Sequence, residues 1–312
     1  MPVMNEHGLP LMPATAVFGA DGYIGRNLVR ILRQANPDSV GVGRRSGTGH
    51  LFLDLARPDT GPLNLKSRGI THAVIAAGIT NVALCEREPE RSRTVNVLGT
   101  VELARQLQLD GVRVIALSSD YVFDGRTGGY DENAPVNPLN GYGRQKAEME
   151  ENLFGACGGD VLVVRLSKVF DTIRGSGTLL DEMAEKLLGG GIVRAAFDQF
   201  FCPALIDDVV CGVLSLLASE RTGVVHLCSP VRVSRLQLAG KLASSLGCDP
   251  GRVQGISLHE LGEDFVRPLD TSMLCTRIAG MPPERFTSVD DCIARMNSSN
   301  YREDHNGMGV TG

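Results

Sequence analysis

The first half of the chain alternates uniformly apolar runs of strand length with longer segments in which apolar residues recur at helical spacing. The expected strands lie at 15–19, 39–43, 50–55, 71–78, 112–120 and 160–167. The expected helices lie at 23–34, at 89–108 and around 137–148. Strands that are apolar throughout and alternate with helices are typical of a parallel sheet covered on both faces. The pattern therefore predicts an α/β fold with a doubly wound parallel sheet.

The pattern loosens beyond about residue 169. Further helices are expected at 175–191, 206–219 and 234–247, and a strand at 223–229. We predict that this strand returns to the first sheet and that the remaining elements build a second, smaller α/β lobe. The predicted parts are a first domain at 14–168 joined by 204–230, a smaller lobe at 169–203 and 231–296, and flexible tails at 1–13 and 297–312.

Composition and charge narrow the choice of partner. The chain has 312 residues, of which 43% are hydrophobic and 21% charged, as in ordinary globular proteins. Its net charge of −5 offers no basic field for nucleic acid, and no apolar run reaches the length of a membrane span. The first residues also lack the pattern of a secretory signal. We therefore expect a cytoplasmic protein with a small-molecule partner, neither nucleic acid nor membrane. A homodimer is one assembly open to it, and the sequence leaves the oligomeric state undecided.

The eight cysteines and six histidines do not form a metal or disulfide pattern. The cysteines occur singly, without a CxxC pair, and the histidines are scattered. In a chain of this size without a signal, this arrangement predicts reduced thiols and no metal site.

A glycine-rich turn follows the first expected strand. In "GADGYIG" the glycines are Gly19, Gly22 and Gly25, and the next expected helix begins within the turn. Such a turn lets the backbone approach a pyrophosphate, and the helix N-terminus supplies free N–H groups. A tight strand-to-helix turn without a ligand is the alternative. The position of the glycine turn after the first strand favours a dinucleotide site. Tyr23 and Ile24, in the same turn, would also contribute to it.

The residues after the next strands suggest which dinucleotide binds. Arg44 and Arg45 stand where a site for NAD usually has an acid, so the sequence favours the 2′-phosphate of NADP(H), with NAD(H) as a second possibility. A solvated basic turn is the alternative. Asp54 is a candidate partner for the adenine edge. The other expected cofactor contacts are Leu55, Ala76, Ala77 and Gly78.

A catalytic group is expected where the strand 112–120 ends. Ligands of such sheets bind outside the carboxyl ends of the strands, and this strand ends in Ser119 and Asp120. Tyr142 and Lys146 are four residues apart and share one helical face. Tyr142 can protonate a ketone oxygen that Ser119 also hydrogen-bonds, while Lys146 holds the nicotinamide ribose and lowers the pKa of the phenol. A surface helix carrying both residues by chance is the alternative.

The blocks "GADGYIG", "SSDYVFDG", "ENAPVNPLNGYGRQKAE" and "RPLDTS" together resemble the extended short-chain dehydrogenase/reductases, and among them the dTDP-4-dehydrorhamnose reductase family. The resemblance covers about residues 14–295. It implies an NAD(P)-binding Rossmann domain followed by a substrate-binding lobe, and it supports catalytic roles for Ser119, Tyr142 and Lys146. It also places Asn96 in support of the active-site strand. The substrate contacts that we expect are Val82, Ser119, Asp120, Tyr121, Lys168 and Arg267.

The substrate segments depart from that family. Lys168 stands where relatives commonly carry an aromatic residue. The segment "FCPAL", residues 201–205, replaces a Ser-Pro-Thr-like segment. Ala83 replaces an acid. A lysine in this pocket would suit a more acidic or differently substituted ketone.

Three functions follow as hypotheses. The first is an NADPH-dependent reductase of a nucleotide-linked 4-keto-6-deoxy sugar. The second is a sugar-nucleotide epimerase or dehydratase on the same scaffold. This hypothesis is less favoured, because dehydratases usually need an acid/base pair and the sequence offers Asp120 without an adjacent glutamate. The third is a non-catalytic NADP-binding subunit resembling the regulatory beta subunit of methionine adenosyltransferase.

Overall fold

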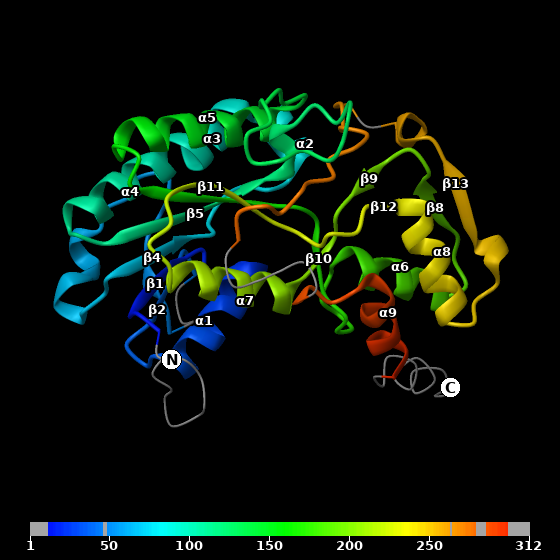
Figure 1. Cartoon of the computed structure of the whole chain (residues 1–312), viewed down its shortest axis with the longest axis horizontal. Coiled ribbons are helices and arrows are strands. Elements are labelled where there is room, and N and C mark those ends of the chain that lie inside the picture. The colour runs from blue at the N-terminus through cyan, green and yellow to red at the C-terminus, as the bar shows by residue number, and fades with distance from the viewer. Residues whose placement is uncertain (1–11, 46–48, 263, 279–284, 299–312) are drawn as a thin grey trace.

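The structure is a computed structural model of the chain, and it describes residues 12–45, 49–262, 264–278 and 285–298 (Figure 1). Its largest element is a seven-stranded sheet in which all neighbouring strands run parallel. In spatial order, the strands are β11 (Gly223–Leu227), β6 (Val161–Leu166), β5 (Arg113–Ser119), β4 (His72–Ile75), β1 (Thr15–Phe18), β2 (Val40–Gly43) and β3 (Leu51–Phe52). The predicted doubly wound α/β fold is confirmed.

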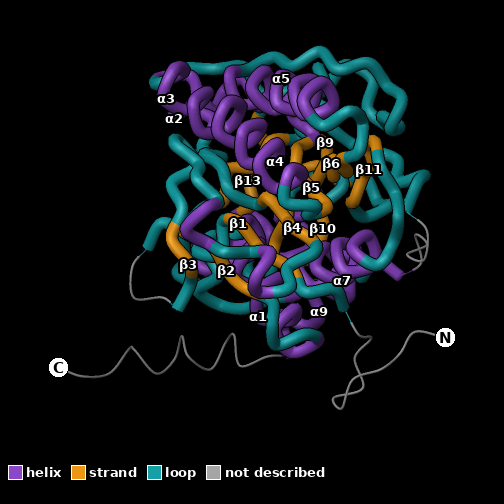
Figure 2. Tube along the Cα trace, turned by 90° about the vertical axis from the view of Figure 1, so that its left-hand side faces the viewer, coloured by secondary structure: helices purple, strands orange, loops and turns teal. Residues whose placement is uncertain are grey.

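Helices cover both faces of this sheet (Figure 2). On one face lie α1 (Tyr23–Ala35) and α7 (Ile206–Leu217), and on the other α4 (Thr100–Leu109) and α5 (Gly141–Ala156). Side chains alternate across a strand, so Val17 joins the first core while its neighbours Ala16 and Phe18 join the second. The strands are apolar throughout because each of their faces is buried.

Helices α2 (Val82–Arg87) and α3 (Pro89–Arg93) lead through a π-helical turn, Thr94–Gly99, into α4. The short 3-10 turns are at Gly61–Leu63, Lys66–Arg68, Asp120–Val122, Pro250–Arg252 and Leu258–Leu261. Within the described residues, each helix is too short or too polar to cross a membrane.

A separate apolar core lies in the C-terminal half. It joins α6 (Leu179–Leu188), α8 (Arg235–Ser245) and α9 (Val289–Ser298), which Figure 1 shows at the end of the molecule away from the large sheet. Its paired strands are β8 (Val193–Ala196) with β13 (Val253–Ile256), β9 (Phe200–Phe201) with β12 (Val233–Ser234), and β7 (Val169–Phe170) with β10 (Ala204–Leu205).

The predicted division into domains stays a proposal. Strand β11 pairs with β6 in the large sheet, and α7 packs against the same face as α1. The predicted tails need correction at their inner ends. Met12 is 4% exposed and packs in the first core, and α9 continues to Ser298. The remainder of both predicted tails, 1–11 and 299–312, lies outside the described residues.

The order of the strands determines where a ligand can bind. The chain passes from β1 to β2 on one side and returns to β4 on the other, so the strand order reverses between β1 and β4. Crossover connections leave a crevice at such a point, outside the carboxyl ends of the strands. The turns after β1, β4, β5 and β6 all meet at this edge.

Candidate active site

The glycine turn between β1 and α1 is too tightly packed for any larger residue. Gly19 has a φ of +91°, and a Cβ atom on it would lie 2.6 Å from the backbone nitrogen of Ala77. A Cβ on Gly25 would lie 2.1 Å from the carbonyl oxygen of Gly19. Gly22 is the N-cap of α1, whose first turn has no acidic residue. The turn therefore presents the positive end of a helix at the sheet edge, which suits an anionic pyrophosphate.

A cavity of about 260 Å³ adjoins this turn. It brings together most of the residues predicted to bind the cofactor, namely Gly19, Gly22, Arg44, Arg45, Asp54, Leu55, Ala76, Ala77 and Gly78. The side chains of Arg44 and Arg45 are exposed at its rim. The residues present thus fit an adenosine carrying an extra phosphate.

Asp21, which the sequence analysis missed, organises the arginine loop. Its Oδ2 atom accepts hydrogen bonds from the backbone N–H groups of Arg44 and Arg45, at 3.0 and 3.2 Å. Burial raises the pKa of Asp21, but these amides and His50 outweigh it and hold the pKa below its usual value. Its carboxylate leaves no room for a Cβ on Gly43. The sequence signal that could have identified Asp21 was its position as an acid inside the glycine turn.

Tyr23 was predicted at the cofactor site, but its side chain lies elsewhere. Its hydroxyl donates a 2.8 Å hydrogen bond to Oδ2 of Asp171, in the segment after β7, and burial raises the pKa of the phenol. Tyr23 therefore links the start of α1 to the C-terminal half. Ile24 lines the larger of the two cavities instead.

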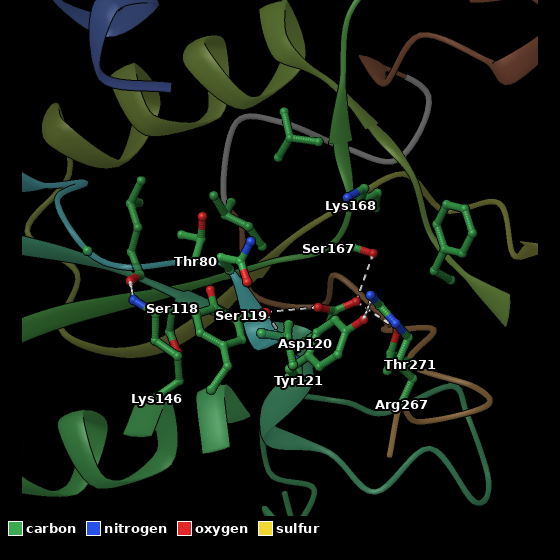
Figure 3. Close-up of a pocket in the computed structure, with 18 of the residues that line it drawn as sticks. Thr80, Ser118, Ser119, Asp120, Tyr121, Lys146, Ser167, Lys168, Arg267 and Thr271 are labelled. Atoms are coloured by element: carbon green, nitrogen blue, oxygen red, sulfur yellow. Dashed lines mark hydrogen bonds between the residues drawn. The ribbon is translucent and has the colours of Figure 1, made fainter. Parts of the chain in front are cut away.

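The larger cavity, of about 580 Å³, lies outside the ends of β4, β5 and β6 (Figure 3). Ala76, Ala77 and Gly78 line both cavities, so the two adjoin each other. The larger cavity collects the predicted catalytic and substrate-binding residues Val82, Ser119, Asp120, Tyr121, Tyr142, Lys146, Lys168 and Arg267.

The Ser119 hydroxyl is held at the end of β5. It donates a hydrogen bond to Oδ1 of Asp120, at 3.0 Å, and accepts one from the backbone N–H of Tyr121, at 3.2 Å. The second Asp120 oxygen accepts hydrogen bonds from Ser167, at 3.2 Å, and Thr271, at 2.7 Å. Burial raises the pKa of Asp120, while the three hydroxyls oppose the rise. Ser119 can donate to a bound carbonyl only by turning its proton away from Asp120.

Tyr142 and Lys146 lie on one face of α5, as predicted, but their electrostatics differ from the prediction. The Lys146 ammonium is 6.0 Å from the centre of the Tyr142 ring and donates a 2.8 Å hydrogen bond to the carbonyl of Leu117. Burial raises the pKa of Tyr142, although hydrogen bonding by Ser119 lowers it in part. Burial also lowers the pKa of Lys146 to about 8, although Glu150 opposes this. Desolvation by the closed cleft therefore outweighs the expected lowering of the phenol pKa.

The start of α5 fixes the position of Tyr142. Asn140 caps the helix by accepting a hydrogen bond from the backbone N–H of Gly143, at 2.9 Å, and donates another to the carbonyl of Val266, at 3.0 Å. Gly143 packs directly on the turn that follows β5, where a Cβ would lie 2.2 Å from the carbonyl oxygen of Tyr121. The rings of Tyr121 and Tyr142 meet edge to face at 5.9 Å.

The other predicted residues take clear positions. Arg267 donates a 3.1 Å hydrogen bond to the Tyr121 hydroxyl. Lys168 lines the cavity and is also exposed to solvent, and it stays a candidate for binding the substrate. Asn96 supports a different segment from the one expected. Its side-chain amide bonds both backbone groups of Ile79, after β4, and donates to Gln145 on α5.

Sequence reasoning did not name several polar residues of the larger cavity, among them Thr80, Asn81, Ser167, Gln199, Arg235 and Thr271. Three of them come from the C-terminal half. Thr271 belongs to the block "RPLDTS", which was the available signal for it, whereas no motif around Gln199 or Arg235 indicated a site. Within the described residues, no group of three His, Cys, Asp or Glu side chains is placed to hold a metal ion.

The fold and the two adjoining cavities define a dinucleotide-binding protein of the Rossmann class with a second binding region beside the cofactor site. The comparison with known families then gives a specific assignment. The RmlD substrate binding domain matches residues 14–297, and the chain belongs to this family.

Individual relatives agree with this family. A dTDP-4-keto-6-deoxy-D-glucose reductase of Streptomyces niveus is 28% identical over 90% of this chain and 97% of its own length. The methionine adenosyltransferase 2 subunit beta of Danio rerio is 25% identical over 84% of this chain and 83% of its own. The crystal structure of a Bacillus anthracis dTDP-4-dehydrorhamnose reductase in complex with NADP covers 90% of this chain and 97% of its own, with a TM-score of 0.80 and 21% identity. This last likeness concerns the fold.

The packing of Gly143 gives a testable prediction. Gly143→Ala should destabilise the protein by about 2 kcal/mol, because the new methyl group must displace the backbone after β5. Gly155→Ala is the matched control in the same helix, since a Cβ there meets no atom within 4 Å. That change should stabilise the protein by up to about 1 kcal/mol through helix propensity. Urea unfolding of both variants measures the difference, and equal stabilities would contradict the close packing.

Proposed function

We propose that this chain is an NADPH-dependent reductase of a 4-keto-6-deoxy sugar attached to a nucleoside diphosphate, or of a close analogue. The observation that carries the proposal is the meeting of Ser119, Tyr142 and Lys146 on one cavity that adjoins the glycine turn. The relatives whose names describe reductases of such sugars support the substrate class. The test is NADPH consumption with a panel of nucleotide-linked keto sugars.

The cofactor site favours NADP(H) over NAD(H). The glycine turn would hold the pyrophosphate, and Arg44 and Arg45 would hold the 2′-phosphate of the adenosine. When bound, the reduced nicotinamide supplies the hydride that the keto carbon accepts. Lys146 lines the larger cavity and would bind the nicotinamide ribose.

Ser119 and Tyr142 would act on the ketone oxygen. Ser119 turns its proton from Asp120 to the carbonyl and so fixes its position, and Tyr142 gives its proton to the oxygen as negative charge develops there. A raised pKa keeps the phenol protonated in the resting site, which suits a proton donor. The Lys146 ammonium stabilises the phenolate left behind.

A non-catalytic NADP-binding subunit is the second candidate. The likeness to the beta subunit of methionine adenosyltransferase from Danio rerio favours it. Such a protein would bind NADPH without consuming it and would purify with a partner protein. An epimerase or dehydratase would also show no net consumption of NADPH. The panel of keto sugars therefore separates the first candidate from both alternatives.

Cytoplasmic location and a homodimer remain proposals. All eight cysteines are free thiols, which agrees with a reducing compartment. Sedimentation analysis of the purified chain tests the dimer.

Tyr142→Phe removes the proposed proton donor and keeps the ring. We expect kcat to fall by at least about 100-fold, because general acid catalysis contributes on that order. NADPH binding should stay within about twofold, since the ring still packs against Tyr121. Stopped-flow and steady-state rates with the best keto sugar measure both quantities. Turnover at the original rate would contradict the role of Tyr142.

The pKa of Lys146 predicts an alkaline limit to activity. Its folded-state pKa of about 8 means that the ammonium is lost as pH rises through about 8, so kcat should fall there. Unfolding does not explain such a fall. Because the unfolded lysine has a pKa of 10.5, the unfolded state binds more protons between pH 8 and 10.5, and this group makes stability rise with pH. Lys146→Arg should shift the limit upward, whereas an unchanged profile would exclude Lys146 as its source.

The two arginines after β2 predict the choice of cofactor. Replacing both Arg44 and Arg45 by Ser should weaken NADPH binding by at least about tenfold and NADH binding by less than twofold, because only NADPH carries the 2′-phosphate. Arg30→Ser, an exposed position on α1, is the matched control. The chain has no tryptophan, so nicotinamide fluorescence gives the affinity directly. Equal losses for both cofactors would place the arginines outside the phosphate site.

A further inference from the structure

Lys168 is a cation at the substrate side of the larger cavity, next to the catalytic strand. Leu166 of β6 pairs with Ser119 of β5, so Lys168 stands two residues beyond the paired position, outside the sheet edge. The preceding residue, Ser167, bonds Asp120, which in turn bonds Ser119. Figure 3 shows Lys168 above Ser167, across the cavity from Lys146. A sugar carbonyl held by Ser119 and Tyr142 therefore brings its ring close to Lys168.

The side chain of Lys168 is exposed, and its ammonium forms no hydrogen bond or ion pair within the described part of the chain. Asp120 is the carboxylate on the same cavity wall, and it already accepts hydrogen bonds from three hydroxyl groups. Glu182, on α6, is exposed and attracts Lys168 only at a distance, whereas Arg235 and Arg267 repel it. Burial and these two arginines lower the pKa of Lys168. A ligand that brings an anion to Lys168 would relieve the repulsion.

Gln199 supplies a second, independent sign of a ligand in the same cavity. The residue is 6% exposed and lines the cavity, and its Oε1 atom is buried without a hydrogen-bond partner among the described residues. A buried polar group left unpaired costs about 1–3 kcal/mol. Because an amide oxygen is an acceptor, the missing partner is a donor such as a sugar hydroxyl.

The backbone around Gln199 cannot easily move to satisfy this amide. The carbonyl of Gln199 accepts a 3.2 Å hydrogen bond from the backbone N–H of Arg235, where β9 pairs with β12. The next residue, Phe200, donates to the carbonyl of Leu269, at 2.6 Å, and accepts from the N–H of Thr271, at 3.0 Å. Three chain segments thus hold Gln199 against the cavity.

We propose that Lys168 and Gln199 form a subsite for an acidic sugar ring, in which Lys168 binds a carboxylate and Gln199 accepts a hydrogen bond from a ring hydroxyl. The inference rests on the proposed function and selects, among the close analogues named there, nucleotide-linked keto sugars in which a carboxylate replaces the 6-deoxy methyl group beside the reacting carbon. A 6-deoxy sugar presents a methyl group at that place, which offers no charge to the ammonium of Lys168.

A pair of ligands that differ only at this substituent tests the subsite. Glucuronic acid and glucose, each linked to UDP and each linked to dTDP, are titrated into the NADP⁺-loaded protein by calorimetry. We expect the acidic sugar to bind at least about tenfold more tightly, as one charge-assisted hydrogen bond provides. Lys168→Met should abolish this preference and leave the binding of the neutral sugar within about twofold.

Lys186→Met, at an exposed position on α6, is the matched control and should keep the preference. Gln199→Met should weaken both sugars equally, by about three- to tenfold, because the ring hydroxyls are common to them. Equal binding of acid and neutral sugar by the unaltered protein would overturn the subsite. So would a Lys168→Met variant that weakens both sugars alike, since that result would assign Lys168 to the diphosphate.

Turnover separates this inference from the proposed function. If the protein reduces a neutral nucleotide-linked 4-keto-6-deoxy sugar with NADPH but shows no preference for the acid, the subsite is wrong and the reductase stands. If the acid is preferred through Lys168 but no keto sugar of either kind consumes NADPH, the subsite stands and the reductase is wrong.

Discussion

The carboxylate of Asp120 joins three of the segments that line the larger cavity. It receives hydroxyl hydrogen bonds from Ser119 at the end of β5, from Ser167 after β6, and from Thr271 in the C-terminal half. A buried carboxylate is tolerated only when its oxygens are satisfied, so each of these segments must stay in place for the others to be stable. The C-terminal half is thus fixed to the sheet at the point where chemistry is proposed.

A second buried polar network lies between α5 and the strands β5 and β6. Arg165 of β6 forms an ion pair with Glu150 of α5, at 2.6 Å, and Ser118 also donates to Glu150. Removing one partner of such a pair leaves an uncompensated buried charge, which costs more than the pair itself contributes. Because Glu150 also favours the charged form of Lys146, this pair connects the packing of α5 to the electrostatics of the cavity.

Local patterns were sufficient for the fold and for much of the site. Period, turn chemistry and strand ends placed Gly19, Ser119 and Tyr142 at one edge of a parallel sheet, because topology fixes where the carboxyl ends of strands meet. Sequence reasoning did not indicate that the Tyr23 hydroxyl bonds Asp171, which lies 148 residues away in sequence. No local pattern contains such a contact.

The sequence by itself determined the alternation of strands and helices, the glycine turn and the helical spacing of Tyr142 and Lys146, since each depends on neighbouring residues. Only the tertiary structure decided the pKa of those two groups, because it depends on how much water the folded cleft excludes. It alone also decided that Gln199 faces the same cavity as Lys168. Desolvation and long-range contacts arise only when distant segments pack together, so patterns among neighbouring residues do not predict them.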